Sequence, residues 1–245
     1  MIKFKLFGKK GNTLYYPGCL YRYILKEFNE NYLKILDRME IDYIYIDEFA
    51  CCCLPLYNSG MKDKFVEYAR KLVEILRSYE VTNVITSCPA CAYCLKEIYP
   101  KFFDINLEVK HITQIIYEKI KSGKLSEFKD KFKGIKATYH DPCHLRLLKI
   151  FDEPREILKY LGFDLVEMEL SRESSYCCGG GGGLRARHFD LSQNIAKERI
   201  KQALKTNAKI LVTSCPMCYL QLKKFGDSIK VEEFSSLFRN LIEMK

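Results

Sequence analysis

The sequence predicts an α/β protein built from two pseudo-symmetric repeats, each a small, mostly parallel sheet flanked by helices. Residues 84–91 (VITSCPAC) recur almost unchanged as residues 211–218 (LVTSCPMC), 127 positions later. Strand-like apolar runs also alternate with stretches of helical periodicity in both parts of the chain. A self-similarity of this kind indicates a duplicated unit. The cysteines follow predicted strands, so we expect them at the carboxyl ends, where open α/β sheets bind ligands.

The first repeat contains three predicted strands and two long predicted helices. Residues 13–16 form a short strand that leads to Pro-Gly-Cys. Residues 21–39 carry apolar side chains at helical spacing and predict one amphipathic helix. Residues 42–47 predict the second strand, residues 61–79 the second helix and residues 83–86 the third strand. The order β-α-β-α-β-α favours parallel strands joined by helical crossovers.

The third predicted strand leads into a helix that begins with proline. Pro89 suits a first helical turn, where its missing N–H is no loss. Cys88 then lies at the N-cap and Cys91 just inside the helix. The positive end of a helix dipole favours thiolates, which makes this a suitable place for anionic sulfur ligands.

The second repeat follows the same order. We expect the first repeat over residues 1–122 with a closing helix at 111–120, a lysine-rich linker over 123–136, and the second repeat over 137–245. Its middle strand is predicted at residues 165–168, and its closing helix at 235–244.

Composition places the chain among globular proteins, with 245 residues of which 48% are hydrophobic. No secretory leader is recognisable at the N-terminus, and no apolar run is long enough to span a bilayer. We therefore expect a cytoplasmic location, where twelve cysteines in short motifs point to metal or redox chemistry rather than to structural disulfides.

The formal charge of +9 is densest between residues 119 and 136. We interpret this stretch as a solvated face, with a docking surface for an acidic electron-transfer partner as the alternative. Nucleic acid is not expected as a partner, because no recognition motif accompanies the charge.

A cysteine pair followed by five glycines is the most unusual segment, Cys177-Cys178 and then residues 179–183. Glycine loses the most backbone entropy on ordering, so such a loop needs a compensating contact. Glycines permit close approach to a bound object, and adjacent thiols supply soft ligands. We therefore predict a cofactor pressed against this loop.

Each repeat carries five cysteines from three predicted strand ends, and this number favours a cluster of several irons. Structural zinc is an alternative, although a zinc ion takes only four ligands. A redox dithiol is another, because an isolated Cys-x2-Cys can form one. Both alternatives apply above all to the first repeat, which lacks the glycine loop. These five cysteines are Cys19, Cys51, Cys52, Cys88 and Cys91 in the first repeat, and Cys143, Cys177, Cys178, Cys215 and Cys218 in the second.

These motifs resemble the CCG family of cysteine-rich domains, found in the disulfide-reducing subunit of heterodisulfide reductases. The resemblance extends from Tyr15 to about Lys223 and rests on the segments YPGC, YHDPCH, CCG and SCPMC. It implies a non-cubane [4Fe–4S] cluster on the five cysteines of each repeat and reduction of a small-molecule disulfide. The candidate catalytic residues are Cys143, Cys177, Cys178, Cys215, Cys218 and His144.

The first repeat departs from this pattern at two positions. Cys53 stands where the second repeat has Gly179, and Cys94 has no counterpart. We expect both to be small buried side chains, the commoner state of a free cysteine. Cys53 leaves open which adjacent pair binds, although the spacing to Pro55 favours Cys51 and Cys52.

Three histidines lie close to the cysteines of the second repeat. His140 and His144 flank Cys143 and could donate hydrogen bonds to a sulfur or protonate a leaving thiolate, or only orient the loop. His188, just past the glycines, is a weaker candidate of the same kind.

The chain shows no G-x-G-x-x-G motif and no four-cysteine ferredoxin run. We therefore expect a ferredoxin-type or flavoprotein subunit as the electron donor. The alternative functions are an electron-transfer subunit of a lactate-, glycerol-phosphate- or other 2-hydroxy-acid-oxidising complex, and a zinc-stabilised interaction module without redox activity.

Overall fold

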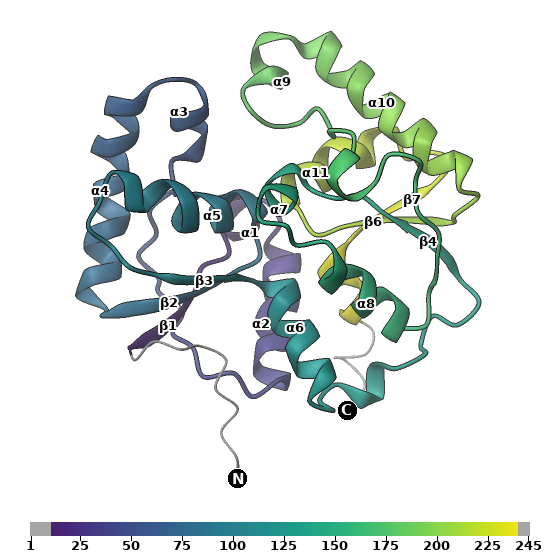
Figure 1. Cartoon of the computed structure of the whole chain (residues 1–245), viewed down its shortest axis with the longest axis horizontal. Coiled ribbons are helices and arrows are strands. Elements are labelled where there is room, and N and C mark those ends of the chain that lie inside the picture. The colour runs from purple at the N-terminus through teal and green to yellow at the C-terminus, as the bar shows by residue number, and fades with distance from the viewer. Residues whose placement is uncertain (1–10, 240–245) are drawn as a thin grey trace.

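The computed structural model describes residues 11–239 as two α/β units that lie side by side (Figure 1). The first unit has a three-stranded sheet in the order β1-β2-β3, and the second a four-stranded sheet in the order β5-β4-β6-β7. Every strand pair is parallel, which confirms the predicted fold class. The strands are β1 (Asn12–Tyr15), β2 (Val81–Thr86), β3 (Glu108–His111), β4 (Lys136–Tyr139), β5 (Asp164–Leu165), β6 (Ile210–Thr213) and β7 (Lys230–Glu233).

Helices connect the parallel strands, as crossovers between parallel strands require. The α-helices are α1 (Cys19–Tyr23), α2 (Lys26–Arg38), α3 (Leu54–Asn58), α4 (Lys62–Ser78), α5 (Pro89–Tyr93), α6 (Ile112–Lys121), α7 (Cys143–Leu147), α8 (Asp152–Tyr160), α9 (Leu184–Arg187), α10 (Phe189–Lys205) and α11 (Pro216–Leu222). Shorter turns are the π-helix η1 (Cys94–Ile98) and the 3-10 helices η2 (Tyr99–Lys101), η3 (Ser126–Phe128), η4 (Arg172–Ser174), η5 (Lys223–Phe225) and η6 (Phe234–Phe238).

The predicted strand at residues 42–47 is wrong. Only Ile44 pairs with β1, through one bridge to Leu14. The chain leaves the sheet because the Arg22 guanidinium donates to the carbonyl oxygens of Ile46 and Asp47, at 2.9 and 2.7 Å. The bridge occupies the place that β5 has in the second sheet, so the two sheets share one topology.

The middle strand of the second repeat is also shorter than predicted. β5 ends at Leu165, and the last ladder bond runs from the Val166 N–H to the Ala137 oxygen at 2.9 Å. The next residue, Glu167, turns to form an ion pair with the buried Arg155, which draws the chain away from β4. Two edge strands, β3 and β7, were not predicted because each is only four residues long with half of them buried.

The helix predicted over residues 21–39 is in fact two helices. Leu25, between α1 and α2, has ψ of 50°, and its N–H bonds to the Leu20 oxygen five residues back. The break lets α1 hold Cys19 at the sheet edge while α2 packs its apolar stripe on the core.

The other predicted helices agree better. The predictions at 61–79 and 111–120 correspond to α4 and α6. The predicted closing helix at 235–244 is the 3-10 helix η6 as far as Phe238, and residues 240–245 lie outside the described part. The predicted linker buries Leu125 and Phe128 in the core, while the repeat boundaries themselves stay a prediction.

The apolar core is continuous between the two units. Alternate residues of β1 and β2 point to opposite faces, as strand geometry requires. Leu14 and Val84 pack with α4 in a core whose buried residues all come from the first unit, whereas Tyr15 and Ile85 belong to a larger core that includes buried residues of both units. Burial on both faces explains the nearly unbroken apolar runs of the central strands.

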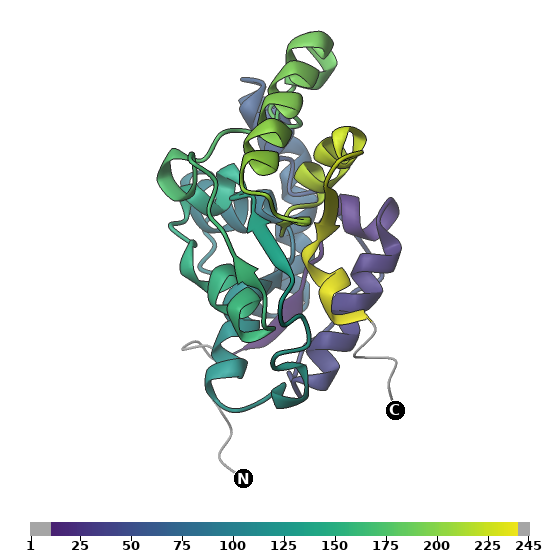
Figure 2. The ribbon, with the colours of Figure 1, turned by 90° about the vertical axis from the view of Figure 1, so that its right-hand side faces the viewer.

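The helices that close each repeat pack on the other repeat. α6, which follows β3, packs against α8 of the second unit (Figure 1). Reciprocally, η6, which follows β7, packs against α2 of the first unit (Figure 2). Two further contacts are reciprocal in the same way: α5 of the first unit contacts α7 of the second, and α11 of the second unit contacts α1 of the first. The elements that carry cysteines are therefore brought to the contact between the units.

Glu233, at the end of β7, is fully buried at this contact. Its Oε1 accepts hydrogen bonds from the hydroxyls of Tyr21 and Tyr32 in the first unit, at 2.8 and 2.7 Å. Its Oε2 accepts from the Ser235 N–H at 2.8 Å. Burial raises the pKa of this carboxyl to about 7.

We expect Glu233→Gln to abolish a pH dependence of stability. The folded protein keeps the proton of Glu233 at pH values where the unfolded chain has lost it, because the pKa rises from 4.5 to about 7. This group therefore stabilises fully below pH 4.5, and its contribution falls as the pH rises to about 7, by on the order of 3 kcal/mol. Urea unfolding of both proteins across this pH range measures the difference. If the unfolding free energies of the two proteins differ by the same amount at every pH in this range, Glu233 does not have the raised pKa.

Candidate functional site

Five predicted ligands of the first repeat lie together and are called here the first thiol cluster: Cys19, Cys51, Cys52, Cys88 and Cys91. Cys19 begins α1 just after β1, and the pair at 51 and 52 ends the loop that follows the Ile44 bridge. Cys88 is the N-cap of α5, with Pro89 in the first turn, as predicted. Three separate segments thus deliver thiols to one edge of the sheet.

The sulfurs of the first thiol cluster form one connected network. The Cys52 and Cys91 sulfurs are 3.5 Å apart. Cys51 is hydrogen-bonded to both Cys19 and Cys52, and Cys91 to Cys88. Every member is connected, so the structure brings together all five residues that the sequence singled out.

Gly18 lets the chain pass directly against these thiols. It has φ of +84°, and a Cβ at this position would lie 2.9 Å from the Cys88 Cβ and 3.0 Å from the Cys91 sulfur. A side chain there would need both a rare backbone conformation and space that the thiols occupy. The Pro-Gly-Cys motif therefore serves the close approach of β1 to α5.

The second thiol cluster consists of Cys143, Cys177, Cys178, Cys215 and Cys218. Cys178 is hydrogen-bonded to Cys177 and Cys218, and Cys218 to Cys215. Cys143 lies at the start of α7, with its sulfur 3.5 Å from the His144 Nδ1. Cys177 is exposed, whereas Cys178, Cys215 and Cys218 are buried. The cluster is thus open to solvent on the side of the glycine loop.

The turn after each cysteine pair has the same backbone. Cys53 and Gly179 occupy matching positions, with φ of +58° and +76°. The Cys53 N–H donates to the Cys51 sulfur at 3.4 Å, and the Gly179 N–H donates to the Cys177 sulfur at 3.3 Å. This match pairs Cys51 with Cys177 and supports the predicted choice of the adjacent pair.

Cys53 and Cys94 are buried, as predicted. Both nevertheless contact the first thiol cluster. The Cys53 thiol donates to the Cys51 oxygen and the Cys94 thiol to the Cys52 oxygen, each at 3.3 Å. Both thiols are therefore bonded to the backbone of the cysteine-pair loop, a contact that the sequence did not reveal.

Hydrogen bonds among the thiols separate their pKa values. Hydrogen bonds with Cys52 and Cys88 lower the pKa of Cys91 to about 6, against the opposing effect of burial. Donation from Cys177 and Cys218 lowers the pKa of Cys178, and His140 adds to this effect. Each cluster therefore stabilises a buried thiolate, and a bound metal would take the place of the protons that neighbouring thiols supply.

Both halves of the sequence are similar to one known protein family. The family model for the CCG cysteine-rich domain matches twice, at residues 13–96 and 137–223. The chain belongs to the CCG family. Each match contains one of the two thiol clusters, so the pseudo-symmetric units are two CCG repeats.

Two known proteins that are similar to this chain are both oxidoreductases by name. The chain is 34% identical over 233 residues to one subunit of the dihydromethanophenazine:CoB–CoM heterodisulfide reductase of Methanosarcina acetivorans, covering 91% of this chain and 56% of that protein. It is 30% identical over 242 residues to the EtfAB:quinone oxidoreductase of Syntrophomonas wolfei, covering 94% of this chain and 34% of that one. The chain therefore spans about half of the first relative and a third of the second.

Among solved structures, the aspartate racemase of Picrophilus torridus is similar with a TM-score of 0.41 and 10% identity, covering 94% of each chain. No helix within residues 11–239 has the length and apolar character needed to cross a membrane.

The three histidines near the second CCG repeat differ in environment. His140 is buried beside the second thiol cluster. His144 is partly buried, and its ring lies 5.4 Å from that of Tyr93 in the first CCG repeat. His188 is exposed at the start of α10. The first two therefore face the site, and burial lowers the pKa of each.

Two buried arginines of the second CCG repeat were not predicted. Arg155 bonds to Asp141 and Glu167, and Arg199 bonds to His140. Both lie on helices whose surface positions carry many lysines and glutamates, so nothing in the sequence separates them from exposed charges. Arg199 thus lies behind the histidine whose ring nitrogen is within 4.8 Å of the Cys178 and Cys218 sulfurs.

Proposed function

We propose that this chain is the electron-transfer part of an iron–sulfur oxidoreductase, with one multi-iron cluster in each CCG repeat, and that it reduces a small-molecule disulfide. The observation that carries the proposal is the gathering of five thiols from three segments into one network in the first repeat. The proposed ligands are Cys19, Cys51, Cys52, Cys88, Cys91, Cys143, Cys177, Cys178, Cys215 and Cys218.

The residues fit such a cofactor on three counts. The donors are all soft thiols, which suit iron–sulfur clusters. Backbone N–H groups of Cys53, Gly179 and Gly180 already point at ligand sulfurs, as in sites that tune cluster potentials. Because residue 18 is a glycine, no side chain at this position occupies the space beside the thiols of Cys88 and Cys91.

Bound clusters would supply single electrons at a sulfur-rich surface. Reduction of a disulfide takes two electrons and two protons, breaks the S–S bond and releases two thiols. Cys177 is the exposed member of the second thiol cluster, so this side is where a substrate sulfur can approach. The proposed proton donor to the departing thiolate is His144, which is partly buried and hydrogen-bonded to Cys143.

A ferredoxin-type or flavoprotein subunit is the proposed electron donor. The heterodisulfide reductase relative favours disulfide reduction, whereas the EtfAB:quinone oxidoreductase relative favours a second candidate, electron transfer without a disulfide substrate. Disulfide turnover by the iron-loaded complex separates the two.

Metal analysis is the direct test. Protein purified without oxygen is expected to contain about eight irons and eight sulfides per chain, the content of two four-iron clusters. We expect Cys91→Ala to lose about half of the iron, because it removes a ligand of one cluster only. Iron, sulfide and zinc assays with EPR spectroscopy provide the measurement.

The matched control is Cys94→Ala, which removes a buried thiol three residues away in the same helical segment. It is expected to retain all the iron. Zinc in both repeats without sulfide would refute the proposal and leave a zinc-stabilised interaction module.

A further inference from the structure

His140 has one ring nitrogen with a partner and one without. Its side chain is 1% exposed, and Nδ1 accepts a hydrogen bond from the Arg199 Nε at 3.0 Å. Nε2 is buried and has no hydrogen-bond partner of the usual geometry among residues 11–239. The sulfurs of Cys178 and Cys218 and a ring nitrogen of His140 lie within 4.8 Å of one another. A free polar atom thus lies beside two proposed ligands.

Arg199 is held rigidly behind this histidine. It is fully buried, and its Nη1 donates to the Leu170 oxygen and to the Gln202 Oε1, both at 2.7 Å. Its Nη2 donates to the Ser175 hydroxyl at 3.1 Å. The guanidinium is therefore fixed in place from three directions, and its Nε–H is aimed at the imidazole.

This contact decides the tautomer. A guanidinium has only donors, so the histidine atom that faces it must be an acceptor. Nδ1 is consequently without a proton, and the neutral ring carries its proton on Nε2. Coordination of a metal through Nε2 would require the proton on Nδ1, where it would face the Arg199 N–H at 3.0 Å. The arrangement disfavours His140 as a metal ligand.

We propose that His140, held in the Nε2–H form by Arg199, donates a hydrogen bond to a sulfur of the second cluster and makes this cluster the more easily reduced of the two. The inference rests on the proposed function, since it takes both clusters as given. Hydrogen bonds to cluster sulfurs raise reduction potentials, and the buried positive charge of Arg199 acts in the same direction.

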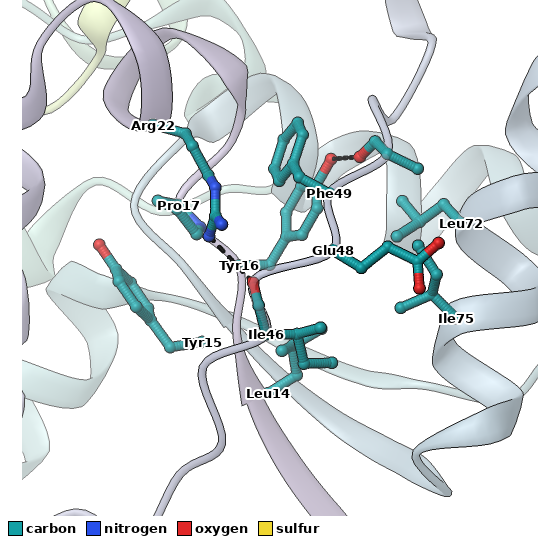
Figure 3. A pocket seen from close by; sticks show the side chains of 11 residues that line it. Leu14, Tyr15, Tyr16, Pro17, Arg22, Ile46, Glu48, Phe49, Leu72 and Ile75 are labelled. Carbon is teal, nitrogen blue, oxygen red and sulfur yellow. Dashed lines mark hydrogen bonds between the residues drawn. The ribbon is translucent and has the colours of Figure 1, made fainter.

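The first CCG repeat lacks this pair. Tyr16 stands at the position of His140, 124 residues earlier, and its hydroxyl is already used in a bond to the Ala50 oxygen at 2.7 Å (Figure 3). α4 and α10 are both 17 residues long, and Leu72 in α4 matches Arg199 in α10. Figure 3 shows Tyr16 and Leu72 lining one small pocket. No imidazole donor and no guanidinium is therefore provided to the first thiol cluster at these positions.

The asymmetry gives the electrons a direction. An electron that enters at the first cluster moves toward the more positive potential, which is the second cluster. The second cluster is also the one with the exposed Cys177. The first repeat would thus receive electrons from the donor protein, and the second would deliver them to the substrate.

The tautomer can be tested without any cluster. Long-range ¹H–¹⁵N NMR spectra of the full chain, labelled at histidine and kept reduced, are expected to show His140 with its proton on Nε2 at neutral pH. A proton on Nδ1, or on both nitrogens, would overturn the inference. In iron-loaded protein, a strong ¹⁴N hyperfine coupling from His140 would also overturn it, since this would identify the histidine as a ligand.

The redox consequence needs the iron-loaded chain. The double variant His140→Tyr/Arg199→Leu copies the Tyr16 and Leu72 pair of the first repeat. An EPR-monitored redox titration is expected to show the second cluster shifted to a more negative potential and the first cluster unchanged. The control Tyr16→Phe is expected to leave the second cluster unchanged. An unshifted second cluster in the folded double variant would refute the redox role.

Failure of the two proposals can be told apart. Protein that takes up no iron contradicts the proposed function, and the NMR result on the same chain still reports the tautomer. Protein that takes up iron but has the other tautomer contradicts only this inference.

Discussion

Gly179→Ala is expected to destabilise the protein by about 3 kcal/mol or more. The position has φ of +76°, and a left-handed conformation costs a residue with a Cβ about 1–2 kcal/mol. The added Cβ would lie 2.5 Å from the Ser192 backbone oxygen in α10, and overpacking of this kind adds about 1–3 kcal/mol. Because the Gly179 N–H donates to the Cys177 sulfur, we also expect loss of iron from the second CCG repeat. Urea unfolding and iron assays measure both effects.

Gly181→Ala is the matched control in the same loop. It has no positive φ, and a Cβ at this position meets no atom of the described residues within 4 Å. Its unfolding free energy is expected to equal that of the wild type within about 0.5 kcal/mol. Equal effects of the two substitutions would show that the glycines act only through flexibility.

Arg155→Met is expected to cost about 3–5 kcal/mol, the usual effect of breaking a buried ion pair by removing one partner. The Arg155 guanidinium donates to both oxygens of Asp141, at 2.7 and 2.9 Å, and Asp141 is only 2% exposed. Asp141 also accepts from the Arg172 N–H at 2.8 Å, in the segment that leads to Cys177. Equilibrium unfolding in urea tests the stability, and iron content tests the second site.

Two companion variants make this test specific. Arg172→Ala removes only an exposed ion pair with Asp152 and is expected to cost under about 1 kcal/mol. Adding Asp141→Asn to Arg155→Met removes the uncompensated charge, so the double variant should be more stable than Arg155→Met alone. If the double variant loses as much stability as the two single substitutions together, the uncompensated charge of Asp141 is not what destabilises Arg155→Met.

Much of the fold follows from local patterns in the sequence. The helices α4 and α6 and the strands β1 and β2 have strong periodicity or apolar runs, and the structure has them where they were expected. The strands β4 and β6 agree with the expectation that the second repeat follows the order of the first. The errors concern elements whose extent is set by tertiary contacts. The loop at residues 42–47 leaves the sheet because Arg22 donates hydrogen bonds to two of its carbonyl oxygens, and no sequence pattern within the loop predicts these bonds. The short β3 and β7 are edge strands defined by the neighbours they pair with.

The thiol clusters were predictable for a different reason. Duplication repeats the cysteine spacing, so each copy supports the assignment in the other. The buried arginines near the second thiol cluster, Arg155 and Arg199, were not predictable, because their burial and the direction of their hydrogen bonds leave no sequence motif. Cys53 was recognised as a departure from glycine, but only the backbone angle shows that it keeps the glycine conformation.

The reciprocal packing of α6 on α8 and of η6 on α2 is the geometry of an isologous contact, in which one surface serves both partners. The chain can thus be understood as a fused dimer whose two halves have since diverged at positions such as Tyr16 and His140. Each half closes the apolar face of its neighbour. A chain cleaved between residues 123 and 136 should therefore remain assembled in solution, and one fragment alone should associate with itself.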